Sequence, residues 1–152
     1  MNTFSKIFVT VFGIGFFPVA PGTLASALTV VFWYFYIQFF TILSFLILIL
    51  LISVLSYFLV KVYISDHMDD DPGEIVIDEL IGQSLPLLFL DSNTDFFLIL
   101  FVFICFRIFD IYKIYPVNLG EKIKGSLGVI ADDIIAGIYT IIFLMIYKII
   151  II

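Results

Sequence analysis

Ionisable side chains interrupt segments of this chain that are otherwise almost wholly apolar. Four are carboxylates near the start of two apolar stretches, and three more follow one another at intervals of three residues: Asp78, Glu79, Asp132 and Asp133, then Arg107, Asp110 and Lys113. A charged side chain at membrane depth is costly, so it marks a functional site by default. We therefore predict that these seven residues form one catalytic site.

The four carboxylates predict a metal site. Placed close together without partners, Asp78, Glu79, Asp132 and Asp133 would repel one another, and a hard divalent cation relieves that repulsion. Oxygen ligands without a set of histidines or cysteines favour Mg²⁺. For Asp78 and Glu79 a second interpretation stays open, in which they only cap the positive end of a helix dipole.

Arg107 and Lys113 predict a phosphate as the group that is bound. An arginine offers a planar pair of donors and a lysine a compact positive charge. The glycines and prolines between Gly13 and Thr23 predict a shaped loop, from which the Gly22 backbone and the Thr23 hydroxyl would also bind phosphate. The alternatives are an Arg107–Asp110 pair that only stabilises packing, and a plain loop that ends in a helix cap.

Composition indicates an integral membrane protein. Of the 152 residues, 63% are hydrophobic and 13% charged, whereas soluble domains carry roughly 25% charged residues. Apolar runs fill the chain, so we predict one membrane domain over residues 1–152. No basic stripe points to a nucleic-acid partner. The single cysteine, Cys105, excludes an internal disulfide. A homo-oligomer is compatible with this composition.

The predicted fold class is all-α, an integral membrane bundle of about four to five helices. The helices are expected over residues 22–38, 42–63, 75–90, 96–115 and 128–150. The third is short for a full span and is either tilted or re-entrant. Pro72 and Gly73 break any helix before it, so the acidic run Asp69–Asp71 and His67 belong to a loop.

Alternation of these helices brings the unusual motifs to one face of the membrane. That face receives the Pro/Gly loop, Asp78 and Glu79, the end of the fourth helix, and Asp132 and Asp133. Six of the seven basic residues lie at or near the same face, and the positive-inside rule makes it cytoplasmic. They are Lys6, Lys61, Arg107, Lys113, Lys122 and Lys124.

Carboxylates, a metal, Arg107 and Lys113 at a membrane surface together suggest phosphoryl chemistry on a lipid headgroup. Several phosphatase schemes are excluded, because Cys105 and Arg107 are too close for a Cys-x5-Arg loop and His67 is the only histidine. No DxDx[TV] signature is present either. The simplest nucleophile is a metal-activated water, and attack by an aspartate to give an aspartyl-phosphate stays open.

At this point the sequence resembles a known family, phosphatidylglycerophosphatase A. The motifs that carry the resemblance cover nearly the whole chain in the right order: Gly13–Gly15 with Pro18–Thr23, Ile75–Gly82, Phe106–Lys113 with Pro116, and Gly128–Gly137. The resemblance implies a small enzyme of the bacterial inner membrane that hydrolyses phosphatidylglycerophosphate to phosphatidylglycerol and phosphate with Mg²⁺. Its motif residues correspond to Asp78, Glu79, Arg107, Asp110, Lys113, Asp132 and Asp133, and to Thr23.

Two rival functions keep the same residues. The first is a phosphatase of another lipid phosphate, such as a polyprenyl pyrophosphate. The second is a non-enzymatic cation transporter that uses the carboxylates as ion ligands. Against the transporter, the acids gather at one face instead of stepping across the bilayer, and the basic residues would repel a cation.

Overall fold

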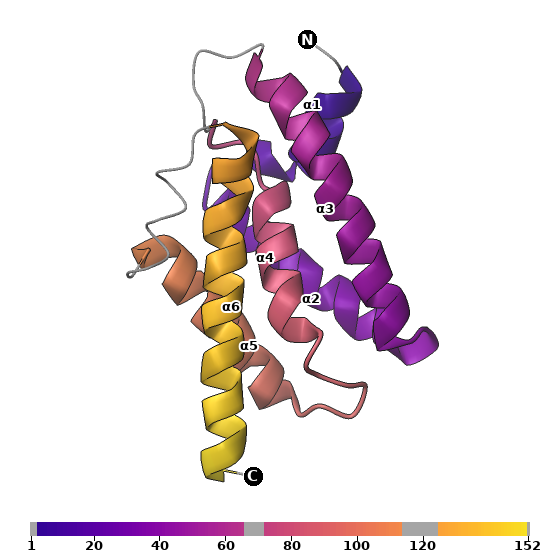
Figure 1. Cartoon of the computed structure of the whole chain (residues 1–152), viewed down its shortest axis with the longest axis vertical. Helices are drawn as coiled ribbons and strands as arrows, with labels where there is room; N and C mark the ends of the chain where they lie inside the picture. The colour runs from indigo at the N-terminus through magenta and orange to yellow at the C-terminus, as the bar shows by residue number, and fades with distance from the viewer. Residues whose placement is uncertain (1–2, 66–71, 114–124, 152) are drawn as a thin grey trace.

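The structure, a computed structural model, describes residues 3–65, 72–113 and 125–151, and this part of the chain is helical without strands (Figure 1). It confirms the predicted all-α class. The described residues form one 3₁₀ turn and six helices: α1 (Thr3–Val9), η1 (Ile14–Phe16), α2 (Pro21–Phe39), α3 (Ile42–Ser65), α4 (Ile77–Leu87), α5 (Phe96–Tyr112) and α6 (Ser126–Ile151).

The five predicted helices are present as α2 to α6, and the short helix α1 is an addition to them. It lies against α3, where the buried Ser5 Oγ donates to the Leu59 carbonyl at 2.7 Å. The loop after it has the predicted glycine geometry, since Gly13 takes φ +94°. His67 and Asp69–Asp71 lie outside the described residues.

Three of these helices are long and apolar enough to cross a membrane: 21–39, 42–65 and 126–150. Large apolar side chains are exposed along all three, as expected of surfaces that face lipid. By contrast, α4 has eleven residues and contains Pro86. At about 1.5 Å per residue it measures roughly 16 Å, about half of the hydrocarbon core.

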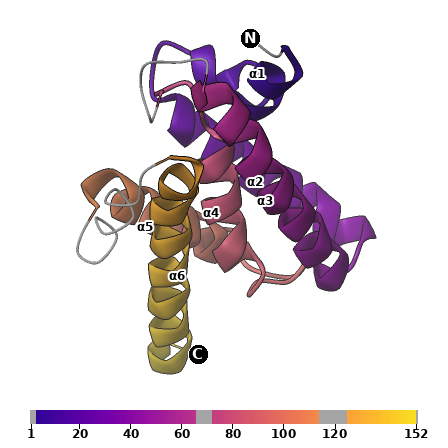
Figure 2. The same ribbon diagram turned by 45° about the horizontal axis from the view of Figure 1, so that its top comes forward.

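The short helix α4 lies at the centre of the bundle. Figures 1 and 2 place it between α6 on one side and α2 and α3 on the other. Its closest approach is to α6, where Gly82 and Gly137 face each other. A Cβ on Gly82 would lie 2.6 Å from the Asp133 carbonyl oxygen, and one on Gly137 would lie 2.6 Å from the Gly82 carbonyl oxygen. Small residues thus let the two backbones touch.

The N-terminal segment anchors the start of α4. Val76, which precedes the helix, donates its backbone N–H to the Val9 carbonyl at 3.0 Å. Gly15 packs directly on the Glu74 carbonyl, with no room for a side chain. The Tyr63 hydroxyl, at the end of α3, donates to Glu74 Oε1 at 2.9 Å. Elements from three parts of the chain therefore hold the first turn of α4 in place.

We expect Gly82→Val to separate α4 from α6 and to lower the unfolding temperature in detergent by several degrees. The added side chain would overlap the Asp133 backbone, and overpacking of this kind costs about 1–3 kcal/mol or more. Gly73→Val is the matched control, because Gly73 is exposed and a Cβ there meets no atom within 4 Å. Equal unfolding temperatures for the two variants would contradict the close packing of α4 on α6.

Candidate active site

Three carboxylates from two helices meet inside the bundle. Asp78 and Glu79 lie in the first turn of α4, and Asp133 lies in the second turn of α6. Each offers an oxygen within 4.8 Å of the others. Asp78 and Asp133 are buried, and Glu79 is half-buried. The N-terminus of α4 favours the negative charge of the two residues in its first turn.

The donor set fits a hard divalent cation. Buried polar atoms are normally hydrogen-bonded, yet Glu79 Oε2 and Asp133 Oδ1 are buried without a hydrogen-bond partner. Oxygen atoms of this kind, from three acids in one place, match the preference of Mg²⁺ and related ions. The cluster can therefore hold a metal, although the structure does not identify which one.

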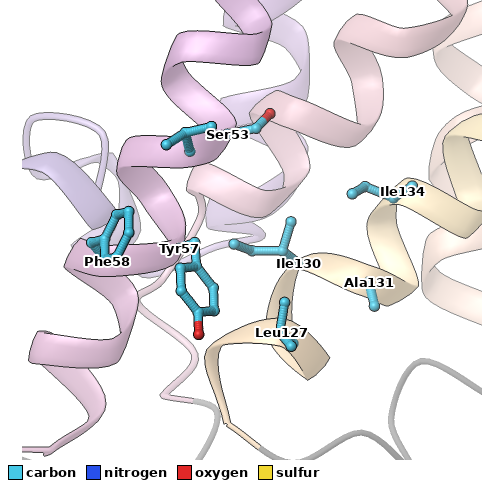
Figure 3. Close-up of a pocket in the computed structure, with 8 residues that line it drawn as sticks. Ser53, Tyr57, Phe58, Leu127, Ile130, Ala131 and Ile134 are labelled. Atoms are coloured by element: carbon cyan, nitrogen blue, oxygen red, sulfur yellow. The ribbon is translucent and has the colours of Figure 1, made fainter.

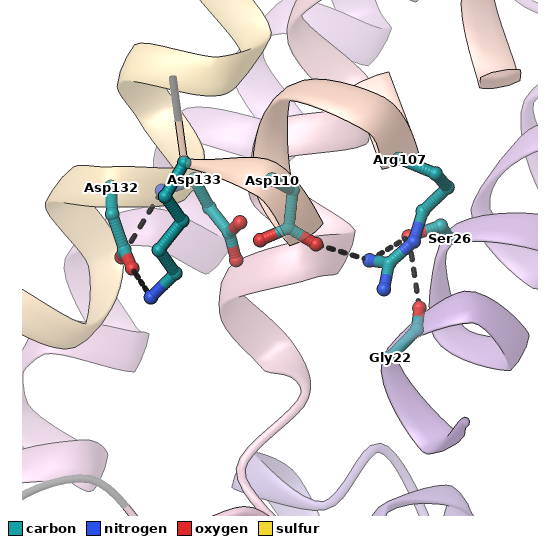
Figure 4. Close-up of polar contacts among 7 residues, drawn as sticks. Gly22, Ser26, Arg107, Asp110, Asp132 and Asp133 are labelled. Atoms are coloured by element: carbon teal, nitrogen blue, oxygen red, sulfur yellow. Dashed lines mark hydrogen bonds and ion pairs between the residues drawn. The ribbon is translucent and has the colours of Figure 1, made fainter. Parts of the chain in front are cut away.

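Arg107 joins Asp110 on α5 to the start of α2 (Figure 4). Its Nη1 lies 2.6 Å from Asp110 Oδ2, one turn further along α5. The same nitrogen donates to Ser26 Oγ at 3.2 Å, and Ser26 Oγ in turn donates to the Gly22 carbonyl at 2.9 Å. The guanidinium is thereby held between α5 and the first turns of α2.

Lys113 pairs with Asp132 at the edge of the same region. Its Nζ lies 2.8 Å from Asp132 Oδ2, and Asp132 Oδ1 accepts the Asp133 backbone N–H at 3.2 Å. Lys113 is the C-cap of α5 and has a left-handed backbone, with φ 45°. Asp132 thus neutralises a lysine, whereas the three oxygens grouped within 4.8 Å come from Asp78, Glu79 and Asp133.

Gly22 brings α2 against the acid cluster. A Cβ on Gly22 would overlap Glu79 Oε1, so only glycine allows this carboxylate to lie against the helix start. Thr23 follows in the first turn of α2 and is half-buried. Of the predicted metal ligands, the structure therefore groups Asp78, Glu79 and Asp133, whereas Asp132 pairs with Lys113. Gly22 lies against Glu79 in this group.

Two partners in this region could not be assigned from sequence. Ser26 contacts Arg107 across 81 residues of chain, and Tyr63 binds Glu74 from the preceding helix. Serine and tyrosine occur throughout apolar helices, and their spacing carries no signal for these pairs.

A separate cavity of about 440 Å³ opens between α3 and α6 (Figure 3). Among the residues that the structure describes, no carboxylate or amine lines it, and these walls lack the groups that phosphoryl chemistry needs. Its walls are apolar apart from one serine and one tyrosine: Ser53, Val54, Tyr57, Phe58, Leu127, Ile130, Ala131 and Ile134. The acid cluster, and not this cavity, is the candidate active site.

Residues 7–148 match the family model described as Phosphatidylglycerophosphatase A. The chain belongs to the phosphatidylglycerophosphatase A family. The match covers every residue of the site, from Gly22 to Asp133. Membership confirms the resemblance of the motifs and the prediction of an enzyme, a phosphoric monoester hydrolase.

Over the aligned residues, three curated relatives are about one third identical to the chain. Two are named phosphatidylglycerophosphatase A. The Escherichia coli protein is 32% identical over 84% of this chain and 73% of its own length. The Haemophilus influenzae protein is 33% identical over 86% of this chain and 80% of its own length. A Bacteroides thetaiotaomicron protein, provisionally named phosphatidylinositol-3-phosphatase, is 32% identical over 91% of this chain and 90% of its own length. No solved structure matches the chain at a significant level.

We expect Mg²⁺ to raise the unfolding temperature of the detergent-solubilised protein by at least about 5 °C. A ligand at 100 times its Kd stabilises by about 2.7 kcal/mol, and 1 kcal/mol shifts the midpoint by about 2–4 °C at this size. Asp133→Asn should lose this response. In EDTA it should unfold no earlier than the natural protein, because one of three mutually repelling carboxylates is gone.

Asp91→Asn is the matched control for this measurement, because Asp91 is exposed in the turn before α5, outside the cluster. It should keep the full response to Mg²⁺. An Asp133→Asn variant that responds as the natural protein does would remove Asp133 from the metal site.

Proposed function

We propose that this protein hydrolyses phosphatidylglycerophosphate to phosphatidylglycerol and inorganic phosphate at the cytoplasmic face of the bacterial inner membrane. The observation that carries the proposal is the cluster of Asp78, Glu79 and Asp133 beside Arg107, inside a bundle of this family. Among the described residues, Lys6 lies on α1, Lys61 near the end of α3, and Lys113 beside Asp132 near the start of α6, and these positions support the cytoplasmic orientation.

Asp78, Glu79 and Asp133 would hold Mg²⁺. When bound, the ion would supply positive charge for phosphoryl oxygens and make water a better nucleophile. The two orphaned carboxylate oxygens, Glu79 Oε2 and Asp133 Oδ1, support this assignment. Asp132, paired with Lys113, would keep that lysine oriented at the edge of the site.

Arg107 and Lys113 would bind the terminal phosphate, with help from the Gly22 backbone and the Thr23 hydroxyl. Asp110 holds one edge of the Arg107 guanidinium, so the remaining N–H groups keep a defined direction. An anion near the N-terminus of α2 is also favoured by the helix dipole. The acyl chains would stay in the bilayer while only the headgroup enters.

Hydrolysis then needs one bond to form and one to break. The oxygen of water forms a bond to phosphorus, and the bond from phosphorus to the glycerol oxygen breaks. The water loses one proton to a carboxylate of the site, and the same proton passes on to the glycerol oxygen as it leaves, so the carboxylate is restored. Arg107 and Lys113 stabilise the charge that spreads over the phosphoryl oxygens in the transition state.

A second substrate is favoured by one observation, the name of the Bacteroides relative. Phosphatidylinositol 3-phosphate is also a phosphate monoester on a lipid headgroup, so the same carboxylates and Arg107 suit its chemistry. The two substrates differ in the alcohol that leaves, a glycerol against an inositol ring. A polyprenyl pyrophosphate and cation transport are the more distant alternatives.

We expect the purified protein in detergent to release phosphate from phosphatidylglycerophosphate with Mg²⁺ and not with EDTA. Phosphatidylinositol 3-phosphate and a polyprenyl pyrophosphate, assayed in parallel, should be hydrolysed at least 10-fold more slowly. Release that survives EDTA would keep the substrate and reject the metal. Faster release from either other lipid would reassign the substrate, and cation flux into vesicles without any release would favour the transporter.

Arg107→Lys should lower kcat/KM at least 100-fold although the charge is kept. A lysine cannot reproduce two parallel N–H donors or reach Asp110 and a phosphate together. The effect is read from steady-state phosphate release, with a rise in KM if ground-state binding is lost. Lys148→Met is the control, since Lys148 lies at the far end of α6 and binds the Phe89 carbonyl. Comparable rates for Arg107→Lys and the natural protein would exclude this role.

A further inference from the structure

Gln83 is a fully buried polar side chain in the second turn of α4. Neither its Oε1 nor its Nε2 has a hydrogen-bond partner. An unsatisfied carboxamide inside an apolar bundle is costly, and an apolar side chain of similar size would pack there without that cost. Packing therefore does not account for a glutamine at this position.

Gln83 shares a face of α4 with Glu79, which lies one turn earlier. The Glu79 carboxylate lies against Gly22, at the start of α2. Helices α2 and α4 both run from the same end of the bundle (Figure 1). Gln83 and Ser26 each lie one turn beyond this contact, Gln83 on α4 and Ser26 on α2, and the Ser26 hydroxyl accepts the Arg107 Nη1 hydrogen bond.

The surroundings favour an anion over the cation as the missing partner. Arg107 binds Ser26 near the start of α2, and its buried Nε also lacks a hydrogen-bond partner. The cation site has its own donors in Asp78, Glu79 and Asp133. A neutral N–H donor beside a guanidinium adds a hydrogen bond to a bound phosphate without adding charge to a membrane-buried region.

We propose that Gln83 is a substrate-binding residue, whose carboxamide N–H donates to a phosphoryl oxygen that Arg107 also binds. This assignment rests on the proposed function, because it requires that a phosphate monoester enters this site. It adds a binding group to the site, one that turns inward from the second turn of α4.

The test measures phosphate binding without turnover, on the full-length protein in detergent. Gln83→Leu should unfold at the same temperature as the natural protein or higher, because two unsatisfied polar atoms are removed. Inorganic phosphate should raise the unfolding temperature of the natural protein and not of the variant, while Mg²⁺ should stabilise both. The KM for the lipid should rise at least 10-fold. Gln38→Leu, the same change at an exposed position, should leave every reading unchanged.

Gln83→Met separates binding from packing if the leucine variant fails to fold. It keeps the unbranched length of the side chain but has no N–H donor, so it should also lose the phosphate response and keep the Mg²⁺ response. A phosphate response that survives in either folded variant would overturn the proposal, as would a variant that loses only the Mg²⁺ response.

The natural protein itself separates this proposal from the proposed function. If inorganic phosphate stabilises the natural protein but no phosphate is released from phosphatidylglycerophosphate, the proposed substrate is rejected. The role of Gln83 is then decided by the phosphate response of its variants. A natural protein whose unfolding temperature does not respond to phosphate would overturn the role of Gln83.

Discussion

The close approach of α4 and α6 is the contact on which the site depends. Gly82 and Gly137 let the two backbones touch, with the Asp133 carbonyl directly against Gly82. This contact places Asp133 beside the first turn of α4, within reach of Asp78 and Glu79. A side chain at either glycine would push the helices apart and separate the carboxylates that a cation needs together.

Charge in this apolar bundle is distributed unevenly, and that unevenness defines the site. Asp110 and Asp132 are each neutralised by a basic neighbour, Arg107 and Lys113. Glu79 and Asp133 keep buried oxygens without hydrogen-bond partners. Asp110 and Asp132 orient Arg107 and Lys113 through these ion pairs. Because a buried polar oxygen without a partner is costly, Glu79 Oε2 and Asp133 Oδ1 are the atoms that a bound ligand would satisfy.

The half-length of α4 explains how a polar site fits a membrane protein. A helix of eleven residues ends inside the bundle, and three longer helices supply the apolar surface that faces lipid. The N-terminal loop and Tyr63 support its first turn through Glu74 and Val76. The carboxylates therefore sit at a fixed depth near one end of the bundle, where a lipid headgroup can meet them.

Composition and apolar runs were enough to predict the helical membrane class. The cost of a charge in an apolar segment was enough to single out the acids, Arg107 and Lys113. Both features can be read from neighbouring residues of the sequence. Helix α1 was not foreseen, since seven residues beside glycines form a helix only when packed on α3. Tertiary structure alone decided that Asp132 pairs with Lys113 while Asp133 joins Asp78 and Glu79. Adjacent residues on a helix point about 100° apart, and only the neighbouring helices decide what each one meets.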